Sequence, residues 1–228
     1  MKSPCFISRE QMERLTEQIL MDYGFDPYDK MVKSAPIEEI IEFHFDLQIC
    51  WESIDHLDKD GLVMAAILPT EKQIILNESH RELFDNKIGT YHFTLAHELG
   101  HWVLHTSETP YLLRLGNSEP ERPTKVQGQP FFCRSTAQKP MEEIQADLFA
   151  GCLLMPRPMI ERAVGQLRKM RKIHLSHLYG LAHCLRVSIS ALSVRLTQLQ
   201  LLTIDQYGNV NRPGTYTHPA FEQLTLDI

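Results

Sequence analysis

Paired cysteines, long apolar runs and a leader segment are all missing from this sequence. Its five cysteines are scattered, odd in number and never spaced as Cys-x-x-Cys, which argues against a disulfide framework and a zinc finger. The N-terminus lacks the apolar stretch of a signal peptide, and no segment is apolar enough to cross a bilayer. These absences predict a cytoplasmic protein with no membrane partner.

The composition is that of an ordinary folded protein, but its charge is unevenly distributed. The 228 residues are 43% hydrophobic and 23% charged, with a net charge of −6. Between residues 156 and 200, however, eight basic side chains accompany a single acidic one. A basic segment of this kind can bind an acidic partner such as nucleic acid, or it can be a solvated helix face, which is the simpler interpretation.

Hydrophobic periodicity predicts an α+β fold with a small antiparallel sheet and a helical C-terminal region. We expect a core over residues 1–158 with a Pro-rich insertion at 107–140, a basic helical subdomain over 159–204, and an irregular tail over 205–228. A strand is expected at 48–51, followed by a hairpin of 61–68 and 73–76. Helices are expected at 8–23, 37–45, 90–105, 141–155, 159–170, 175–185 and 188–199.

One pentapeptide in the predicted helix 90–105 has the spacing of a metal site. In His97-Glu98-Leu99-Gly100-His101 the two histidines stand at i and i+4, so their imidazoles share one helical face and can converge on one ion. Apolar residues on both sides predict that the helix is buried, where polar side chains need a purpose. We therefore expect His97 and His101 to bind Zn²⁺, with Mn²⁺ also acceptable, and Glu98 to be the general base.

A catalytic zinc ion needs a third protein ligand. His105 lies two turns beyond His97, about 12 Å along the helix, which is too far for the same ion and suits a supporting role. Glu143 is the better candidate, because Asp147 follows it by one turn and can accept a hydrogen bond from the second nitrogen of a ligand histidine. Glu142 is the fallback ligand, and both glutamates could instead merely favour the helix N-terminus.

Three segments in this order resemble the ImmA/IrrE family of metallo-endopeptidases. They are FTLAHELGHWVLH (93–105), EIQADLFAGCLLMP (143–156) and LAHCLRVSISALSVRL (181–196). The resemblance implies a gluzincin-like core with a helix-turn-helix-like region behind it, and it implies that Glu143 is the third ligand. It also implies cleavage of a partner protein, typically a helix-turn-helix repressor related to phage repressors, which derepresses mobile-element or stress-response genes.

The expected function is therefore that of a zinc-dependent endopeptidase. Glu98 would take a proton from the attacking water and pass it to the leaving amine. The residue that stabilises the oxyanion stays open among His92, His105 and Tyr111. Cys133, inside the insertion, could occupy the open zinc position and block the enzyme, although an ordinary thiol is the simpler interpretation.

Two other functions remain as alternatives. The first is a DNA-binding regulator, supported by the basic segment and by the helical pattern from 181 to 199. The second is a protein-binding regulator with a structural metal site, which would have no need of Glu98.

Overall fold

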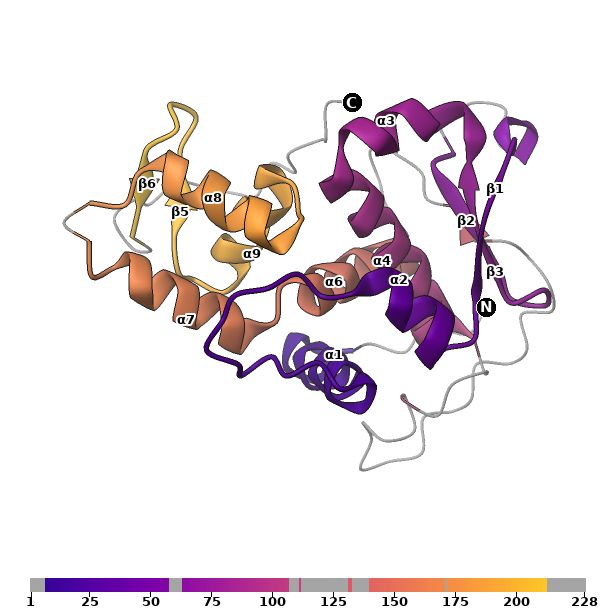
Figure 1. Ribbon diagram of the computed structural model, residues 1–228, viewed down its shortest axis with the longest axis horizontal. Helices are drawn as coiled ribbons and strands as arrows, with labels where there is room; N and C mark the ends of the chain where they lie inside the picture. Colours follow the sequence, from indigo (N-terminus) through magenta and orange to yellow (C-terminus); the bar gives the residue numbers. More distant parts are fainter. Residues whose placement is uncertain are drawn as a thin grey trace.

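The computed structural model describes residues 7–57, 63–106, 111, 131–132, 140–170 and 172–212. A small sheet lies at one end of the molecule, a group of helices fills the middle, and a second helical group lies at the other end (Figure 1). The α+β class is confirmed. None of the helices in these ranges is long and apolar enough to cross a membrane.

The sheet has the strand order β1-β3-β2-β4. β2 (Ala65–Leu68) and β3 (Gln73–Asn77) form the expected antiparallel hairpin. β1 (Gln48–Glu52), however, pairs with β3 in parallel, so the sheet is mixed rather than antiparallel. The chain reverses direction between β1 and β2 and again between β2 and β3, so β3 runs in the same direction as β1. β3 lies between the two earlier strands and therefore pairs with β1 in parallel and with β2 in antiparallel fashion. The two-residue β4 (Phe131–Phe132) pairs with the other edge of β2.

Side chains of the hairpin alternate between two faces, as a pleated strand requires. Ile67, Ile74 and Leu76 join the main core beneath the helices, whereas Ala66 and Ile75 join a smaller cluster on the opposite face. The main core continues through the helices on both sides of residue 158, so one apolar cluster links the two parts that the sequence analysis separates.

Two long helices fill the middle of the molecule. α4 (Ile88–His105) lies across the sheet, and α6 (Met141–Leu154) packs against it, with α1 (Arg9–Tyr23) on the other side of α6 (Figure 1). The expected helix at 37–45 divides into α2 (Ile37–Glu39) and a π-helical turn (Ile40–His44). Three short elements had no clear periodicity in the sequence: 3₁₀ turns at Asp55–Leu57 and Glu78–His80, and α3 (Arg81–Asn86).

The second helical group begins with α7 (Arg157–Leu167), followed by α8 (Leu175–Leu185) and α9 (Ile189–Gln198). α8 and α9 are joined by a short turn in which Arg186 has a left-handed backbone (φ 53°) and the Ser188 hydroxyl caps α9. This is the spacing of a helix-turn-helix.

A small hairpin of β5 (Thr203–Ile204) and β6 (Val210–Asn211) follows α9, and its turn and second strand lie in 205–228, where an irregular tail was expected. Its turn is held by the Asp205 carboxylate, which accepts hydrogen bonds from the backbone amides of Tyr207 and Asn209, and Gly208 supplies a positive φ of 79°. Such side-chain-held turns leave no trace in hydrophobic periodicity.

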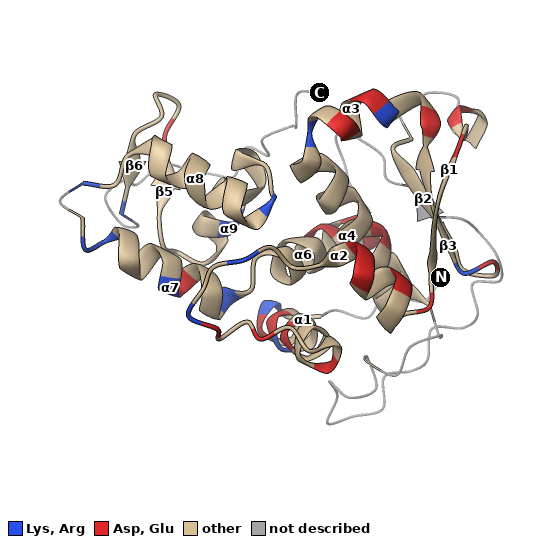
Figure 2. Cartoon of the chain, viewed as in Figure 1, with Lys and Arg blue, Asp and Glu red and all other residues tan. Residues whose placement is uncertain are grey.

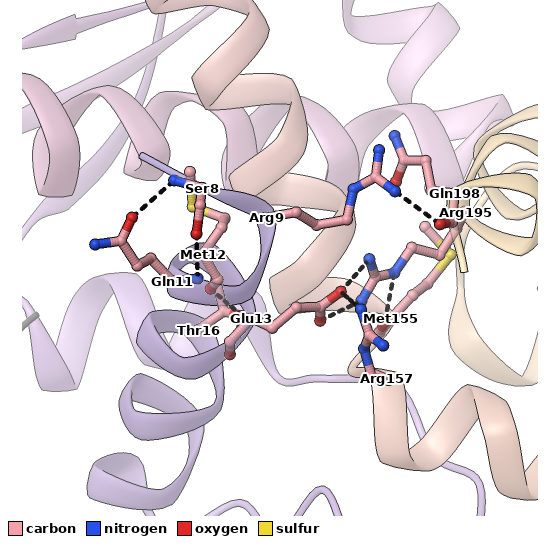
Figure 3. Close-up of polar contacts among 10 residues, drawn as sticks. All are labelled: Ser8, Arg9, Gln11, Met12, Glu13, Thr16, Met155, Arg157, Arg195 and Gln198. Atoms are coloured by element: carbon pink, nitrogen blue, oxygen red, sulfur yellow. Dashed lines mark hydrogen bonds and ion pairs between the residues drawn. The ribbon is translucent and has the colours of Figure 1, made fainter. Parts of the chain in front are cut away.

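A buried ion pair joins the first helix to the last (Figure 3). Arg195 on α9 donates from both terminal nitrogens to the Glu13 carboxylate on α1, at 2.8 and 2.6 Å, and its Nε donates to the Met155 carbonyl at 2.9 Å. The two side chains are only 1% and 5% exposed. A fork-shaped pair with a third hydrogen bond offsets much of the desolvation cost of a buried charge, and it ties α1, the end of α6 and α9 together.

Gly89, in the first turn of α4, lies against the turn between α8 and α9. A Cβ on Gly89 would lie 2.5 Å from the Val187 carbonyl carbon and would collide with the Ser188 nitrogen. We expect Gly89→Ala to lower the free energy of unfolding by about 1–3 kcal/mol, because backbone atoms must move apart. Gly165→Ala on α7 is the matched control, since it meets nothing within 4 Å and should raise stability by up to about 1 kcal/mol. Chemical denaturation measures both, and equal effects would contradict this packing.

Candidate metal centre

The centre of α4 presents the two histidines of the pentapeptide on one buried face. The exposed fractions of His97, Glu98 and His101 are 1%, 0% and 0%. Their one-turn spacing brings the His97 and His101 Nε2 atoms to 3.0 Å from each other. Two imidazole nitrogens that face each other at this distance can share one ion.

α6 supplies the third group. The Glu143 carboxylate reaches both rings, with Oε2 3.2 Å from His97 Nε2 and Oε1 3.2 Å from His101 Nε2. One candidate donor atom from each of the three residues lies within 4.8 Å of the others. The structure thus brings together the residues that the sequence analysis chose, whereas Glu142, the fallback, is outside this cluster.

Glycine at position 100 allows the two helices to approach so closely. A Cβ on Gly100 would lie 3.2 Å from the Ala146 Cα and 3.1 Å from the Phe149 ring. Because Gly100 and Ala146 carry no bulky side chain, α6 lies close enough to α4 for Glu143 to reach both histidines.

Each histidine also has a partner for its other ring nitrogen. His97 Nδ1 lies 2.9 Å from the Asp147 carboxylate, the contact expected from the sequence. His101 Nδ1 lies 3.0 Å from His105 Nδ1, and His105 Nε2 lies 3.1 Å from the Gln145 Oε1. The supporting position of His105 agrees with its expected role. Gln145 was missed, although it stands between Glu143 and Asp147 on the helix that faces α4.

Burial and the neighbouring histidines together set the pKa values of the two carboxylates. Burial raises the pKa of Glu98 to about 8, against the opposing effect of His97. For Glu143 burial would also raise the pKa, but the hydrogen bonds with His101 and His97 outweigh it and lower the value to about 2. Burial lowers the pKa of His101, and it lowers that of His105 to about 4, so both rings favour the neutral form that a ligand histidine needs.

This group of side chains fits a divalent cation. Within the described ranges, both Glu98 carboxylate oxygens are buried without a side-chain hydrogen-bond partner, an arrangement that is costly unless a positive charge compensates it. Two imidazoles and one carboxylate are a donor set that zinc takes in catalytic sites, where a fourth position stays open. His97, His101 and Glu143 could therefore hold such an ion.

Other candidates from the sequence lie elsewhere. The Tyr111 hydroxyl is 2.6 Å from His44 Nε2 and donates to the Asp22 carboxylate at 3.1 Å, so it is engaged by other parts of the chain. His92 is buried, and its Nδ1 has no partner among the residues that the structure describes. Cys133 and most of the insertion 107–140 lie outside the described residues.

The two buried helices thus bring two histidines and a glutamate together in a group that could hold a metal ion. Comparison with known proteins adds to this: residues 133–197 match the family described as the IrrE N-terminal-like domain, a family of peptidases. This match confirms the resemblance to the ImmA/IrrE family over α6 to α9, the part of the chain that contains Glu143 and Asp147. The match does not extend to α4.

Among solved structures, the chain resembles a Mycobacterium tuberculosis transcriptional regulator with 16% identity and a TM-score of 0.49. The likeness covers 91% of this chain and 56% of that protein, so the chain spans little more than half of its length. No curated protein sequence matches this chain. A likeness of this size adds nothing to the argument from the site.

The geometry gives a direct expectation for metal binding. Zinc at a hundredfold excess over its dissociation constant should stabilise the wild type by about 2.7 kcal/mol. Glu143→Gln should lose about 1.3–2.3 kcal/mol of that gain at the same zinc concentration, because removing a charged ligand should weaken the affinity about ten- to hundredfold. Thermal unfolding with and without zinc measures the difference.

Glu142→Gln is the matched control, because it changes the neighbouring carboxylate on the same helix outside the cluster. It should keep the wild-type zinc response. If Glu142→Gln lost as much zinc-induced stabilisation as Glu143→Gln, the choice of Glu143 as the third donor would be wrong.

Proposed function

We propose that this protein is a zinc-dependent endopeptidase, with His97, His101 and Glu143 as metal ligands and Glu98 as the general base. The observation that carries the proposal is the position of Glu98: a carboxylate buried beside the two histidines, with no side-chain hydrogen-bond partner in the described part of the chain. A purely structural metal site has no use for such a group, because burying it costs stability. The peptidase family match supports the same conclusion.

The reaction assigns a task to each residue. A bound zinc ion would supply a Lewis acid that activates water and polarises the scissile carbonyl. Glu98 accepts the proton of the attacking water and delivers it to the leaving amine. Its raised pKa of about 8 means that Glu98 needs a neighbouring positive charge to be ionised at neutral pH. His97 and His101 are held by Asp147 and His105 with their Nε2 atoms directed toward the centre.

The proposed substrate is another protein, in the first place a helix-turn-helix repressor related to phage repressors. This choice follows from the family resemblance, and cleavage would derepress mobile-element or stress-response genes. The cytoplasm is the proposed location, since five scattered cysteines with no disulfide pattern suit a reducing compartment. Mn²⁺ accepts the same ligands as Zn²⁺ and is the alternative metal.

The arrangement of the basic residues gives little support to direct DNA binding. Lys and Arg gather along α7 and the segment after it, whereas Asp and Glu are frequent on α2 and α3 (Figure 2). Several arginines of the basic segment 156–200 are engaged within the protein. Arg195 pairs with Glu13, and Arg162 and Arg168 donate to the carbonyls of Pro27 and Leu201. Arg195 is the single basic residue of α9, the second helix of the helix-turn-helix, and it is buried. This helix therefore offers no exposed cation to a phosphate backbone.

The central test is a substrate trap. Glu98→Gln should retain zinc and lose cleavage by a factor of about 10²–10⁴, because it removes the base but none of the ligands. Tagged Glu98→Gln protein, expressed in the native host, should capture a helix-turn-helix repressor that the wild type cuts. Mass spectrometry of the captured proteins identifies it.

His97→Ala serves as the control without a complete metal site, and Glu142→Gln as a control that should cut normally. Normal cleavage by Glu98→Gln would contradict the role of this residue. Salt-sensitive binding of the wild type to DNA, without any cleaved protein, would favour the regulator instead.

A further inference from the structure

The second nitrogen of His101 begins a hydrogen-bonded chain that runs through His105 to Gln145, a neutral side chain. His101 Nδ1 lies 3.0 Å from His105 Nδ1, and His105 Nε2 lies 3.1 Å from the Gln145 Oε1. Gln145 is buried and His105 largely so. The chain connects one proposed ligand on α4 with the helix that supplies Glu143.

The other histidine is held differently. The Asp147 carboxylate beside His97 Nδ1 can only accept a hydrogen bond when it is ionised, so the proton must be on His97 Nδ1 and the Nε2 lone pair is free for an ion. No such certainty exists for His101. Its partner is an imidazole, which can donate or accept, so the direction of the hydrogen bond must be decided further along the chain.

Only one of the two possible directions is compatible with a metal ligand. If Gln145 accepts through Oε1, His105 carries its proton on Nε2, accepts at Nδ1, and receives the Nδ1 proton of His101. His101 Nε2 then has a free lone pair. If the group at position 145 donates instead, His105 carries its proton on Nδ1 and donates to His101 Nδ1, which forces the His101 proton onto Nε2, where an ion would have to bind.

We propose that His105 and Gln145 are positioning residues that keep His101 in its metal-binding tautomer, with the Gln145 oxygen as the group that sets the direction of both hydrogen bonds. This inference deepens the proposed function and rests on it. His105 and Gln145 would thus raise the metal affinity of the site without touching the ion.

Two substitutions at position 145 separate hydrogen-bond direction from side-chain size. Gln145→Glu supplies an acceptor without a donor, and Gln145→Lys supplies a donor without an acceptor. Zinc affinity, measured by competition with a chromophoric chelator, should stay within about threefold of the wild type for Gln145→Glu. It should fall about ten- to hundredfold for Gln145→Lys, the usual loss when a partner of a ligand histidine is removed.

A second pair of variants keeps the test decisive should Gln145→Lys fail to fold, which circular dichroism detects. His105→Asn retains an acceptor near His101 Nδ1, whereas His105→Leu removes it, so His105→Asn should bind zinc more tightly than His105→Leu. Nitrogen-15 NMR of the zinc-loaded wild type should show His105 protonated on Nε2.

Each outcome bears on a separate part of the account. Equal zinc affinities of the acceptor and donor variants at either position, or a His105 proton on Nδ1, would overturn the relay while leaving the metal ligands intact. A wild type that binds no zinc would overturn the proposed function together with the relay.

Discussion

The close approach of α4 and α6 at Gly100 and Ala146 is the contact on which the rest of the structure depends. Gly100 has no side chain and Ala146 has a single methyl group, so the helices come near enough for residues 143, 145 and 147 of α6 to reach α4. Glu143 contacts both His97 and His101, Asp147 contacts His97, and Gln145 contacts His105. A larger residue at either position would move all of these contacts at once.

The energetic problem that this contact creates is a group of polar side chains inside an apolar core. The buried carboxylates of Glu98 and Glu143 lie between helices whose other faces are packed by leucine, phenylalanine and alanine. α6 must therefore be held in place by contacts elsewhere. α1 packs along it, and the buried pair of Glu13 and Arg195 ties the chain just beyond the end of α6 to α9 (Figure 3). The Glu13–Arg195 pair thus connects α9 to the end of the helix that carries Glu143.

Much of this arrangement could be predicted from local patterns. The long helices follow from apolar periodicity, and the choice of Glu143 over Glu142 follows from its one-turn spacing to Asp147. Features that depend on distant partners could not be predicted: the insertion of β3 between β1 and β2, and the contact of Gln145 with His105. The local turn held by Asp205 was missed for another reason, because side-chain hydrogen bonds leave no hydrophobic period. Arg195 illustrates the difficulty, because in the sequence it adds to a basic segment, whereas in the structure its charge is buried against Glu13, 182 residues away.

The central claim is that two imidazoles and one carboxylate bind one metal ion, and X-ray absorption spectroscopy of the zinc-loaded protein tests it most directly. We expect one zinc per chain, a shell of nitrogen and oxygen atoms at about 2.0–2.1 Å, and the scattering signature of two imidazoles. That signature should be lost in His97→Ala. A sulfur atom at about 2.3 Å would instead show that a cysteine occupies the open position, and a spectrum unchanged in His97→Ala would contradict the site itself.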